Sequence, residues 1–225
     1  YRAWDKSVGN AGDRPNTAGA GAGTSPFSAA SGRATITVTP VNDAPVIAGL
    51  DATPTFVENG AAIAVYASVT LADVDLDAMN GGLGDYAGAT LTVERQGSAD
   101  PSDDFDFPAS SGTLTYDGTT IYSGATEIGV YGDVGGTLTV QFVNWGIVPT
   151  KAMVNEVVSA LRYRNVGDDP THTLPAATNP IGLSYRLDDG NAGAQGVGVA
   201  MSDTKSITLA ATVDNDAPAL LGVGA

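Results

Sequence analysis

Three aspartates alternate in the stretch "DVDLD", which places Asp73, Asp75 and Asp77 at every second position. In a strand their carboxylates would point the same way, and in a turn they could wrap around an ion. Three like charges so close together are unfavourable unless water solvates them or a cation neutralises them. Ca²⁺ takes six to eight oxygen ligands from carboxylates, carbonyls, amides and water. The spacing therefore indicates either a site for a hard cation or a set of solvated carboxylates.

Two other stretches offer oxygen atoms of the same kind. The turn "DDGN" supplies the carboxylates of Asp188 and Asp189 and the amide of Asn191. The tag "VNDAP" contains Asn42 and Asp43, and its proline stiffens the chain as it leaves. Both stretches are candidate parts of a cation site, and both are also compatible with ordinary solvated turns.

The tag recurs near the other end of the chain as "VDNDAP", so that Asp43 and Asp216 lie 216 − 43 = 173 positions apart. The flanks recur with it: "YRAWDKSVGNAG" matches "YRLDDGNAG", and "ATITVTP" matches "KSITLAATV". A period this long is the size of a domain. We expect three parts. Residues 1–43 contain the last strands of a preceding repeat and a flexible Gly/Ala/Ser-rich loop at 16–32. Residues 44–216 form a complete repeat, and residues 217–225 are the start of the next repeat or a tail.

The elements that must position these residues are mostly strands. Short segments rich in Val, Ile, Thr and Tyr, bounded by Gly or Asp, lie at 62–71, 89–96, 112–118, 126–132, 136–143, 181–190 and 206–213. They predict an all-β, antiparallel sandwich of the immunoglobulin type. One segment differs, because Met153, Val154, Val157, Val158 and Leu161 form a helical apolar stripe after the N-cap candidate Thr150. It predicts one amphipathic helix at about 150–162 that closes an end of the sandwich.

Composition narrows the classes of function. The 225 residues carry a net charge of −15 and no cysteine. Residues 1–40 have a balance of +2, whereas the remainder has six basic and 23 acidic groups, a balance of −17. An acidic body of this kind repels phosphate backbones, so we expect no nucleic-acid partner. No run of 18 apolar residues is present, so we expect no membrane insertion.

The order of motifs, "NDAPVI…FVENGAAIAV…VTLADVDLD…GTLTYDG…VNEVVSALRYRN…LSYRLDDGNAG…NDAP", resembles the cadherin-like repeats of large, secreted, calcium-dependent bacterial adhesins. The resemblance covers nearly the whole repeat. It implies a tandem immunoglobulin-like sandwich, an extracellular location at the cell surface, and Ca²⁺ at or near the junctions between repeats.

The same resemblance implies a set of calcium ligands. Its first members are Glu58, Asp73, Asp75, Asp188 and Asp43, and its second members are Asp77, Asp189 and Asn191. The sequence departs from the family pattern at "DDGN", which lacks the usual Asp-Gly-Asp order. The matching stretch of the first copy has a lysine, Lys6, which would compete with a cation.

Nothing in the sequence marks an enzyme. The single histidine, His172, lies in a Pro-flanked polar loop, and no Gly-x-Ser-x-Gly elbow or phosphate-binding loop with lysine is present. Four glutamates are present without any sign of a catalytic pair. We therefore expect a non-catalytic protein. The acidic stretch at 98–108 is expected to be an exposed, solvated loop, with a further cation loop as the alternative.

Three functions remain open. The first is a structural extender module, rigidified by Ca²⁺, with adjacent repeats or identical subunits and a cell-surface or matrix component as partners. The second is a self-assembling filament or surface-layer subunit, in which residues 1–40 complete the sheet of a neighbouring molecule. The third is a glycan-binding module that uses Trp4, Trp145 and tyrosines. Trp145 is nevertheless expected in the core.

Overall fold

The structure is a computed structural model that describes residues 1–14, 16–18, 20, 23, 25–50, 53–65, 68–167, 169–171 and 180–213. The chain divides into two compact units, Tyr1–Thr39 and Pro40–Ala225. The tag residues Asn42 and Asp43 therefore belong to the larger unit.

The smaller unit contains one antiparallel pair of strands, β1 (Arg2–Trp4) and β2 (Phe27–Ser31). The guanidinium of Arg2 donates to the carbonyls of Ser28 and Ala29 and holds the two strands together. The strand expected at "ATITVTP" is not formed: residues 32–40 have no regular secondary structure. That expectation was wrong because a strand needs a neighbour, and β1 is paired with β2 instead.

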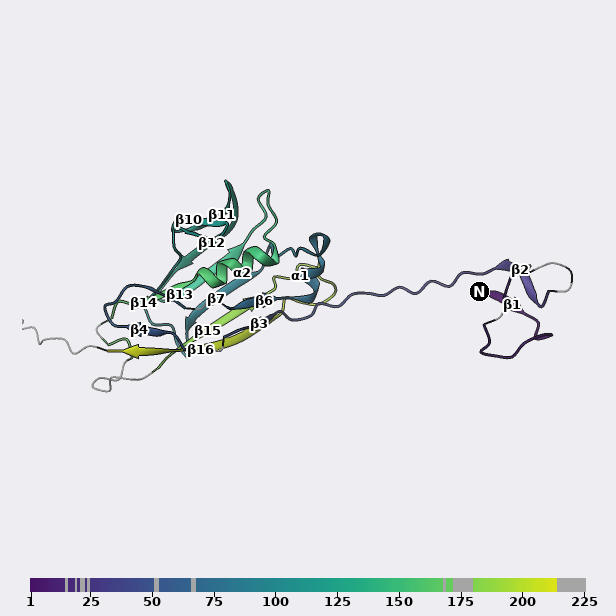
Figure 1. The fold of residues 1–225 in the computed structure, drawn as a ribbon, viewed down its shortest axis with the longest axis horizontal. Coiled ribbons are helices and arrows are strands. Elements are labelled where there is room, and N and C mark those ends of the chain that lie inside the picture. Colours follow the sequence, from purple (N-terminus) through teal and green to yellow (C-terminus); the bar gives the residue numbers. More distant parts are fainter. Residues whose placement is uncertain are drawn as a thin grey trace, which may run out of the picture. The chain divides into compact units, whose positions relative to one another are not determined.

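The larger unit is built on a nine-stranded sheet (Figure 1). Its neighbours pair antiparallel except for β4 and β16, which run parallel. In spatial order the strands are β4 (Thr55–Val57), β16 (Ser202–Thr212), β15 (Ile181–Asp188), β7 (Thr90–Arg95), β13 (Thr137–Phe142), β12 (Thr126–Asp133), β11 (Thr120–Ser123), β10 (Leu114–Tyr116) and β9 (Ser110–Ser111).

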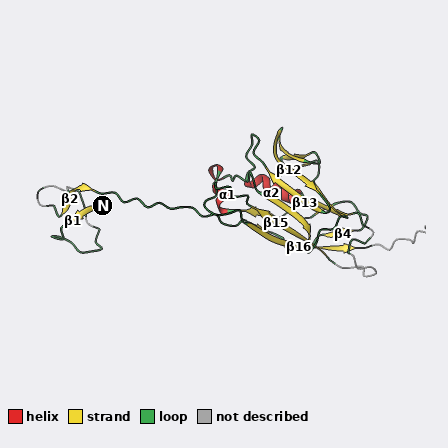
Figure 2. Ribbon diagram, turned by 180° about the vertical axis from the view of Figure 1, so that it is seen from behind, coloured by secondary structure: helices red, strands yellow, loops and turns green. Residues whose placement is uncertain are grey.

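Two small sheets supply the remaining strands. One has the order β5 (Ile63–Ala64), β14 (Arg162–Asn165), β8 (Asp103–Asp106), and the other pairs β3 (Val46–Ala48) with β6 (Thr70–Ala72). Tyr163 of β14 packs against Phe56 of the large sheet, with ring centroids 5.5 Å apart, so the apolar faces share one core. Figure 2 shows the strands from behind. The expected all-β, sandwich-like fold is confirmed.

The expected amphipathic helix is α2 (Lys151–Ala160). The hydroxyl of Thr150 accepts a hydrogen bond from the Met153 N–H, as an N-cap does. Val154, Val157 and Val158 are buried, so the apolar stripe belongs to the core. Glu156 on the same helix accepts hydrogen bonds from the Thr113 and Leu114 N–H groups and ties α2 to the β9–β10 hairpin.

A second short helix, α1 (Val74–Ala78), occupies the "DVDLD" stretch, followed by a 3₁₀ turn, Asn80–Gly82. The expectation of a single helix was therefore wrong. Asp73 is the N-cap of α1, because its carboxylate accepts from the Asp75 and Leu76 N–H groups. The three aspartates thus follow a helical turn, and they do not share the face of a strand. No helix in the described part of the chain has the length and hydrophobicity of a membrane span.

Candidate cation site at the tag

The first tag is held against the loop that connects β15 to β16. Val41 forms an isolated parallel bridge with Val197, and the Asn42 N–H donates to the Val197 carbonyl at 3.1 Å. The Val197 N–H donates in turn to the Pro40 carbonyl. Gly196 has φ +119° and lies so close to Pro40 that a side chain there would collide with its backbone. The backbone of the tag is therefore fixed to its own sandwich.

Asn42 also connects the tag to a buried carboxylate. Its side-chain amide donates to Asp189 Oδ2 at 2.8 Å and to the Val199 carbonyl at 3.1 Å. Asp189 has no solvent exposure, and its Oδ1 accepts from the Asn191 and Met201 N–H groups. The side chain of Gln195 donates to the Asp189 carbonyl. Asp189 thus accepts hydrogen bonds both from the tag and from the β15–β16 loop.

Asp73 lies close enough to Asp189 for the two charges to interact. Burial raises the pKa of Asp73 above its usual value, and the charges of Asp189 and Asp75 raise it further, against hydrogen bonds from the Leu76 and Asp75 N–H groups. Asp73 is only 2% exposed. Among the described residues no basic side chain forms an ion pair with Asp73 or Asp189. Two buried carboxylates without a cationic partner are energetically costly.

Three buried oxygens at this end have no hydrogen-bond partner: Asn42 Oδ1, Asp73 Oδ2 and Gln195 Oε1. Their side chains are 4%, 2% and 5% exposed. Buried polar atoms normally have partners, and an unsatisfied group points to a missing water or ion. Carboxylate and amide oxygens are the donors that Ca²⁺ prefers, so the residues present fit a hard cation.

Carboxylates alone do not make this site. No three Asp, Glu, His or Cys side chains in the described ranges converge closely enough to hold a metal ion. A cation here would therefore depend on the amide oxygens of Asn42 and Gln195 as well as on Asp73 and Asp189.

Asp43 and Asp75 border the same region. The Asp43 N–H donates to Asp75 Oδ2 at 2.8 Å, which joins the tag to the first turn of α1. Asp43, Asp73 and Asp77 line an open hollow together with Ala44 and Val74.

Three other predicted ligands use their side chains for other contacts. Asp77 Oδ2 pairs with the ammonium of Lys151 at 2.6 Å, and its Oδ1 accepts from the Tyr86 hydroxyl. Asp188 pairs with Arg186 on the outer face of the sheet. Asn191 uses its side chain to shape the β15–β16 loop, accepting from Gly193 and Gln195 and donating to Gly196 and Gly198 carbonyls.

The structure separates Glu58 from the other predicted ligands. Glu58 follows β4, and its N–H donates to the carbonyl of Thr212 at the end of β16. Asp189 lies beyond the opposite end of β16, where its N–H donates to the Met201 carbonyl. Glu58 is 4% exposed. Of the second tag, only Val213 lies within the described residues.

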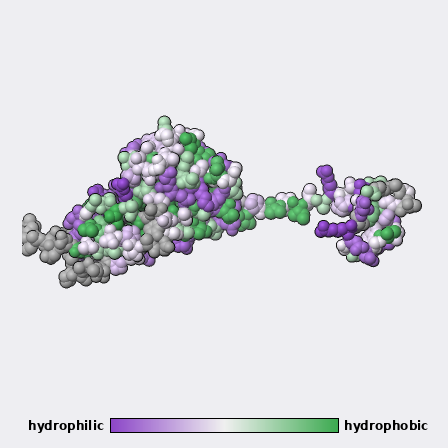
Figure 3. Space-filling model, in the orientation of Figure 1, coloured by the Kyte–Doolittle hydropathy of each residue, from purple (hydrophilic) through white to green (hydrophobic). Residues whose placement is uncertain are grey.

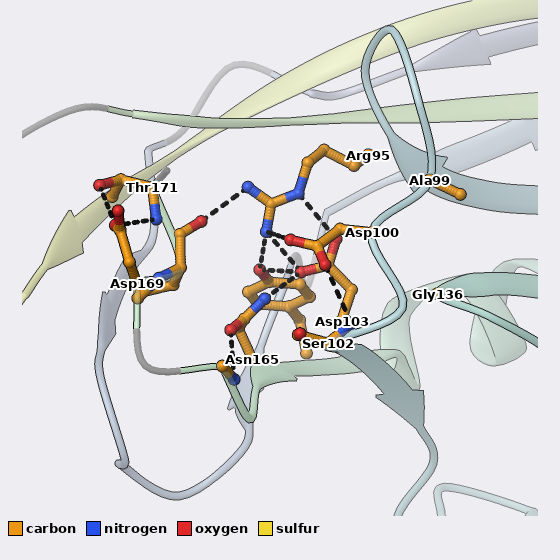
Figure 4. Close-up of polar contacts among 12 residues, drawn as sticks. Arg95, Ala99, Asp100, Ser102, Asp103, Gly136, Asn165, Asp169 and Thr171 are labelled. Carbon is orange, nitrogen blue, oxygen red and sulfur yellow. Dashed lines mark hydrogen bonds and ion pairs between the residues drawn. The ribbon is translucent and has the colours of Figure 1, made fainter. Parts of the chain in front are cut away.

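A second polar cluster lies at the stretch that was expected to be an exposed loop (Figure 4). Arg95 pairs with Asp100 at 3.2 Å and with Asp103 at 2.6 Å. Asp103 also accepts from the Tyr163 hydroxyl and the Asn165 amide. Asp100 and Asp103 are only 7% and 3% exposed, so the expectation of an exposed, solvated loop was wrong for these two carboxylates, whereas Asp106 is exposed. The guanidinium of Arg95 already pairs with both buried carboxylates, which disfavours the alternative of a cation loop there.

Of the residues considered for catalysis or glycan binding, the structure describes the two tryptophans. His172 lies outside the described residues. Trp145 is 62% exposed, so its expected place in the core was wrong. Trp4 belongs to the smaller unit, where its indole N–H donates to the Val8 carbonyl.

Comparison of the chain with protein-family models, with curated proteins and with solved structures finds no match. The ligand set implied by the resemblance did not include Asn42 and Gln195. The repeated tag is a signal for Asn42, but no sequence signal marks Gln195, which reaches the site through the path of the β15–β16 loop.

Proposed function

We propose that this chain is a structural, non-catalytic module of an extracellular bacterial surface protein, and that Ca²⁺ fixes the tag to the sandwich. The observation that carries the proposal is the contact between Asn42 and Asp189, together with the buried oxygens of Asn42, Asp73 and Gln195 that have no partner. The residues that would hold the ion are Asn42, Asp73, Asp189 and Gln195, with Asp43 and Asp75 at the edge of the site.

A bound cation would supply positive charge beside the buried carboxylates, and three segments of the chain would supply its oxygen ligands. Asn42 belongs to the segment that enters the larger unit, Asp73 to the start of α1, and Asp189 to the end of β15. A cation shared by these segments restricts the direction in which the chain enters the sandwich. A stiff junction of this kind would fix the orientation of adjacent repeats or identical subunits, which are the expected direct partners. A cell-surface or matrix component is the second expected partner.

Calorimetric titration of the EDTA-treated full chain with CaCl₂ tests the proposal. The wild-type chain is expected to bind Ca²⁺ with a measurable heat. Asp73→Asn keeps an N-cap residue at the start of α1 while it removes a charge, and it is expected to weaken binding about tenfold or more, roughly 1.4 kcal/mol. Asp189→Asn should weaken binding to a similar extent.

Asp77→Asn is the matched control, because Lys151 already neutralises that carboxylate. It should leave the affinity nearly unchanged. Absence of Ca²⁺ binding by the wild-type chain, or equal losses from Asp73→Asn and Asp77→Asn, would overturn the site. Circular dichroism of each variant establishes that the sandwich is still folded.

A further inference from the structure

Four dipeptides in the chain join an asparagine or an aspartate to a glycine. They are Asn59–Gly60, Asn80–Gly81, Asp117–Gly118 and Asp189–Gly190. In such a dipeptide the glycine nitrogen can attack the side-chain carbonyl carbon of the residue before it, because the glycine has no Cβ to crowd the approach. An asparagine amide releases ammonia in this reaction, whereas an ionised carboxylate has no comparable leaving group. The two asparagines are therefore the candidates for a spontaneous chemical change.

The attacking nitrogen is held by a hydrogen bond in three of the four dipeptides. The glycine N–H donates to the Val57 carbonyl at Gly60, to the Tyr131 hydroxyl at Gly118 and to Asp188 Oδ1 at Gly190, at 2.9, 2.9 and 3.0 Å. In the described part of the chain the Gly81 N–H donates no hydrogen bond. A bound N–H has to give up its hydrogen bond before the nitrogen can attack, so the fold leaves only the Gly81 nitrogen ready to react.

Asn80 and Gly81 lie in a tight turn directly after α1. Their φ angles are 50° and 68°, and the Gly82 N–H donates to the Met79 carbonyl at 2.9 Å, as in a type I′ turn. Asn80, Gly81 and Gly82 are exposed, and at either glycine no other part of the chain lies within 4 Å of the position of a Cβ. In Figure 3 hydrophilic residues lie on the surface around the position that α1 has in Figure 1. Water therefore reaches the turn, and the turn has room to change shape.

The other Asn–Gly dipeptide is more confined. Asn59 is exposed, but Gly60 is half-buried, and a Cβ there would lie 2.7 Å from the Val57 carbonyl oxygen. The same oxygen accepts the hydrogen bond from the Gly60 N–H. The two dipeptides have the same covalent chemistry, and only the fold distinguishes them.

We propose that Asn80 is a site of spontaneous deamidation and isoaspartate formation in the folded chain, and that the fold protects Asn59. The Gly81 nitrogen forms a bond to Cγ of Asn80, the Cγ–Nδ2 bond breaks, and the NH₂ group leaves with the Gly81 proton as ammonia. The product is a five-membered succinimide ring, which one water molecule opens. Breaking the new bond to Cγ gives an aspartate, and breaking the original peptide bond gives an isoaspartate, whose main chain runs through Cγ.

Either product changes the place where α1 is joined to α2. The side-chain amide of Asn80 donates to the Gly84 carbonyl at 3.3 Å, and this donor is lost. In its place stands a negative charge beside the carboxyl-terminal end of α1, where a helix disfavours an anion. The Lys151 N–H at the start of α2 donates to the Leu83 carbonyl in the same turn. The modified chain is therefore expected to melt at a lower temperature than the unmodified chain.

Incubation of the full chain in mildly alkaline buffer with EDTA, followed by tandem mass spectrometry, tests the proposal independently of the calcium site. Asn80 is expected to be deamidated about tenfold faster than Asn59, because the hydrogen bond of Gly60 has to be broken first. Electron-transfer fragmentation distinguishes aspartate from isoaspartate. In urea, where the fold is absent, the two asparagines should react at similar rates. Equal rates in the folded chain, or an Asn80 that reacts only in urea, would overturn the proposal.

Gly81→Ala and Gly82→Ala are a matched pair of variants. Both positions have positive φ, 68° and 87°, and both have open space around them, so the two alanines are strained to a similar degree. Only Gly81→Ala places a methyl group on the attacking residue, and it is expected to slow deamidation of Asn80 about tenfold or more. Gly82→Ala should leave the rate nearly unchanged. Equal slowing by the two variants would contradict attack by the Gly81 nitrogen; circular dichroism establishes that both variants are folded.

Discussion

The guanidinium of Arg95 holds the carboxylate of Asp103 by two bonds, from Nε at 2.9 Å and from Nη2 at 2.6 Å. Arg95 ends β7 of the large sheet and Asp103 begins β8 of a small one, so the pair joins the two layers of the sandwich. Tyr163 and Asn165 of β14 bind the same carboxylate. Burial raises the pKa of Tyr163, and its bond to Asp103 raises it further, so the phenol stays a donor.

Removal of this carboxylate should destabilise the fold. In Asp103→Ala three buried donors lose their acceptor, and we expect a loss of about 3 kcal/mol in the free energy of unfolding. Denaturation by urea measures it. The control is Asp104→Asn, whose partner Arg164 is 48% exposed, and it should cost less than about 1 kcal/mol. Equal effects of the two variants would show that the Arg95 cluster does not join the layers.

The turn between β12 and β13 offers a matched pair of glycines. Gly135 and Gly136 both have positive φ, 64° and 79°, so either alanine variant is strained by about 1 kcal/mol. A side chain at Gly136 would also overlap the carbonyl oxygen of Asp100, whereas nothing lies within 4 Å at Gly135. Gly136→Ala should therefore lower the melting temperature clearly more than Gly135→Ala. Equal shifts would mean that the Asp100 turn moves freely.

Asp203 at the start of β16 should make stability depend on acid pH. Its burial favours a higher pKa, but hydrogen bonds from the Ile47 N–H and from Lys205 outweigh this, and the pKa lies below its usual 3.8. A depressed pKa contributes stability above the unfolded-state value of about 3.9, and this contribution disappears as pH falls through the folded-state value. Asp203→Asn should cost about 1 kcal/mol at pH 7. Urea titrations should show the difference from wild type closing below about pH 4; a difference that widens in acid would contradict this reading.

Calcium should raise the melting temperature if the tag site binds it. A ligand that binds only the folded chain stabilises it by about 2.7 kcal/mol at a concentration one hundred times its dissociation constant. Scanning calorimetry with CaCl₂ and with EDTA measures the shift, and MgCl₂ is the control for ionic strength. The shift should be lost in Asp73→Asn and kept in Asp77→Asn. The same shift in both variants would place the ion elsewhere.

Local patterns were sufficient for most of the sandwich. The alternating Thr and Val or Leu residues of β7 and β13 indicate half-buried strands, and the stripe from Met153 to Leu161 indicates a helix because its period is 3.6. These signals lie within each element. Prediction from sequence therefore recovered α2, several strands of the large sheet and the fold class.

Contacts between elements that are distant in sequence could not be predicted in this way. The alternation in "DVDLD" mimics a strand, but Asp73 caps a helical turn instead. The sequence of the Asp100–Asp103 stretch is typical of an exposed loop, but in the fold Arg95 and Tyr163 bind its carboxylates. Tyr163 lies 60 positions from Asp103 in the sequence. Likewise, the segment at 34–39 and β16 have similar sequences and different environments. In each case the deciding contact is non-local, and a short pattern does not contain it.

The parallel pairing of β4 with β16 has a mechanical consequence. Its bonds include Ala210 N–H to the Pro54 carbonyl and Glu58 N–H to the Thr212 carbonyl, at 2.8 and 3.0 Å. β4 lies near the start of the larger unit and β16 near its end, so a pull on the two ends draws these parallel strands in opposite directions along their shared axis. All their bonds are then loaded in shear at the same moment, instead of opening one after another. Tension that reaches these two strands is thus resisted by three residue pairs loaded together, Ala210–Thr55, Ala211–Phe56 and Thr212–Val57.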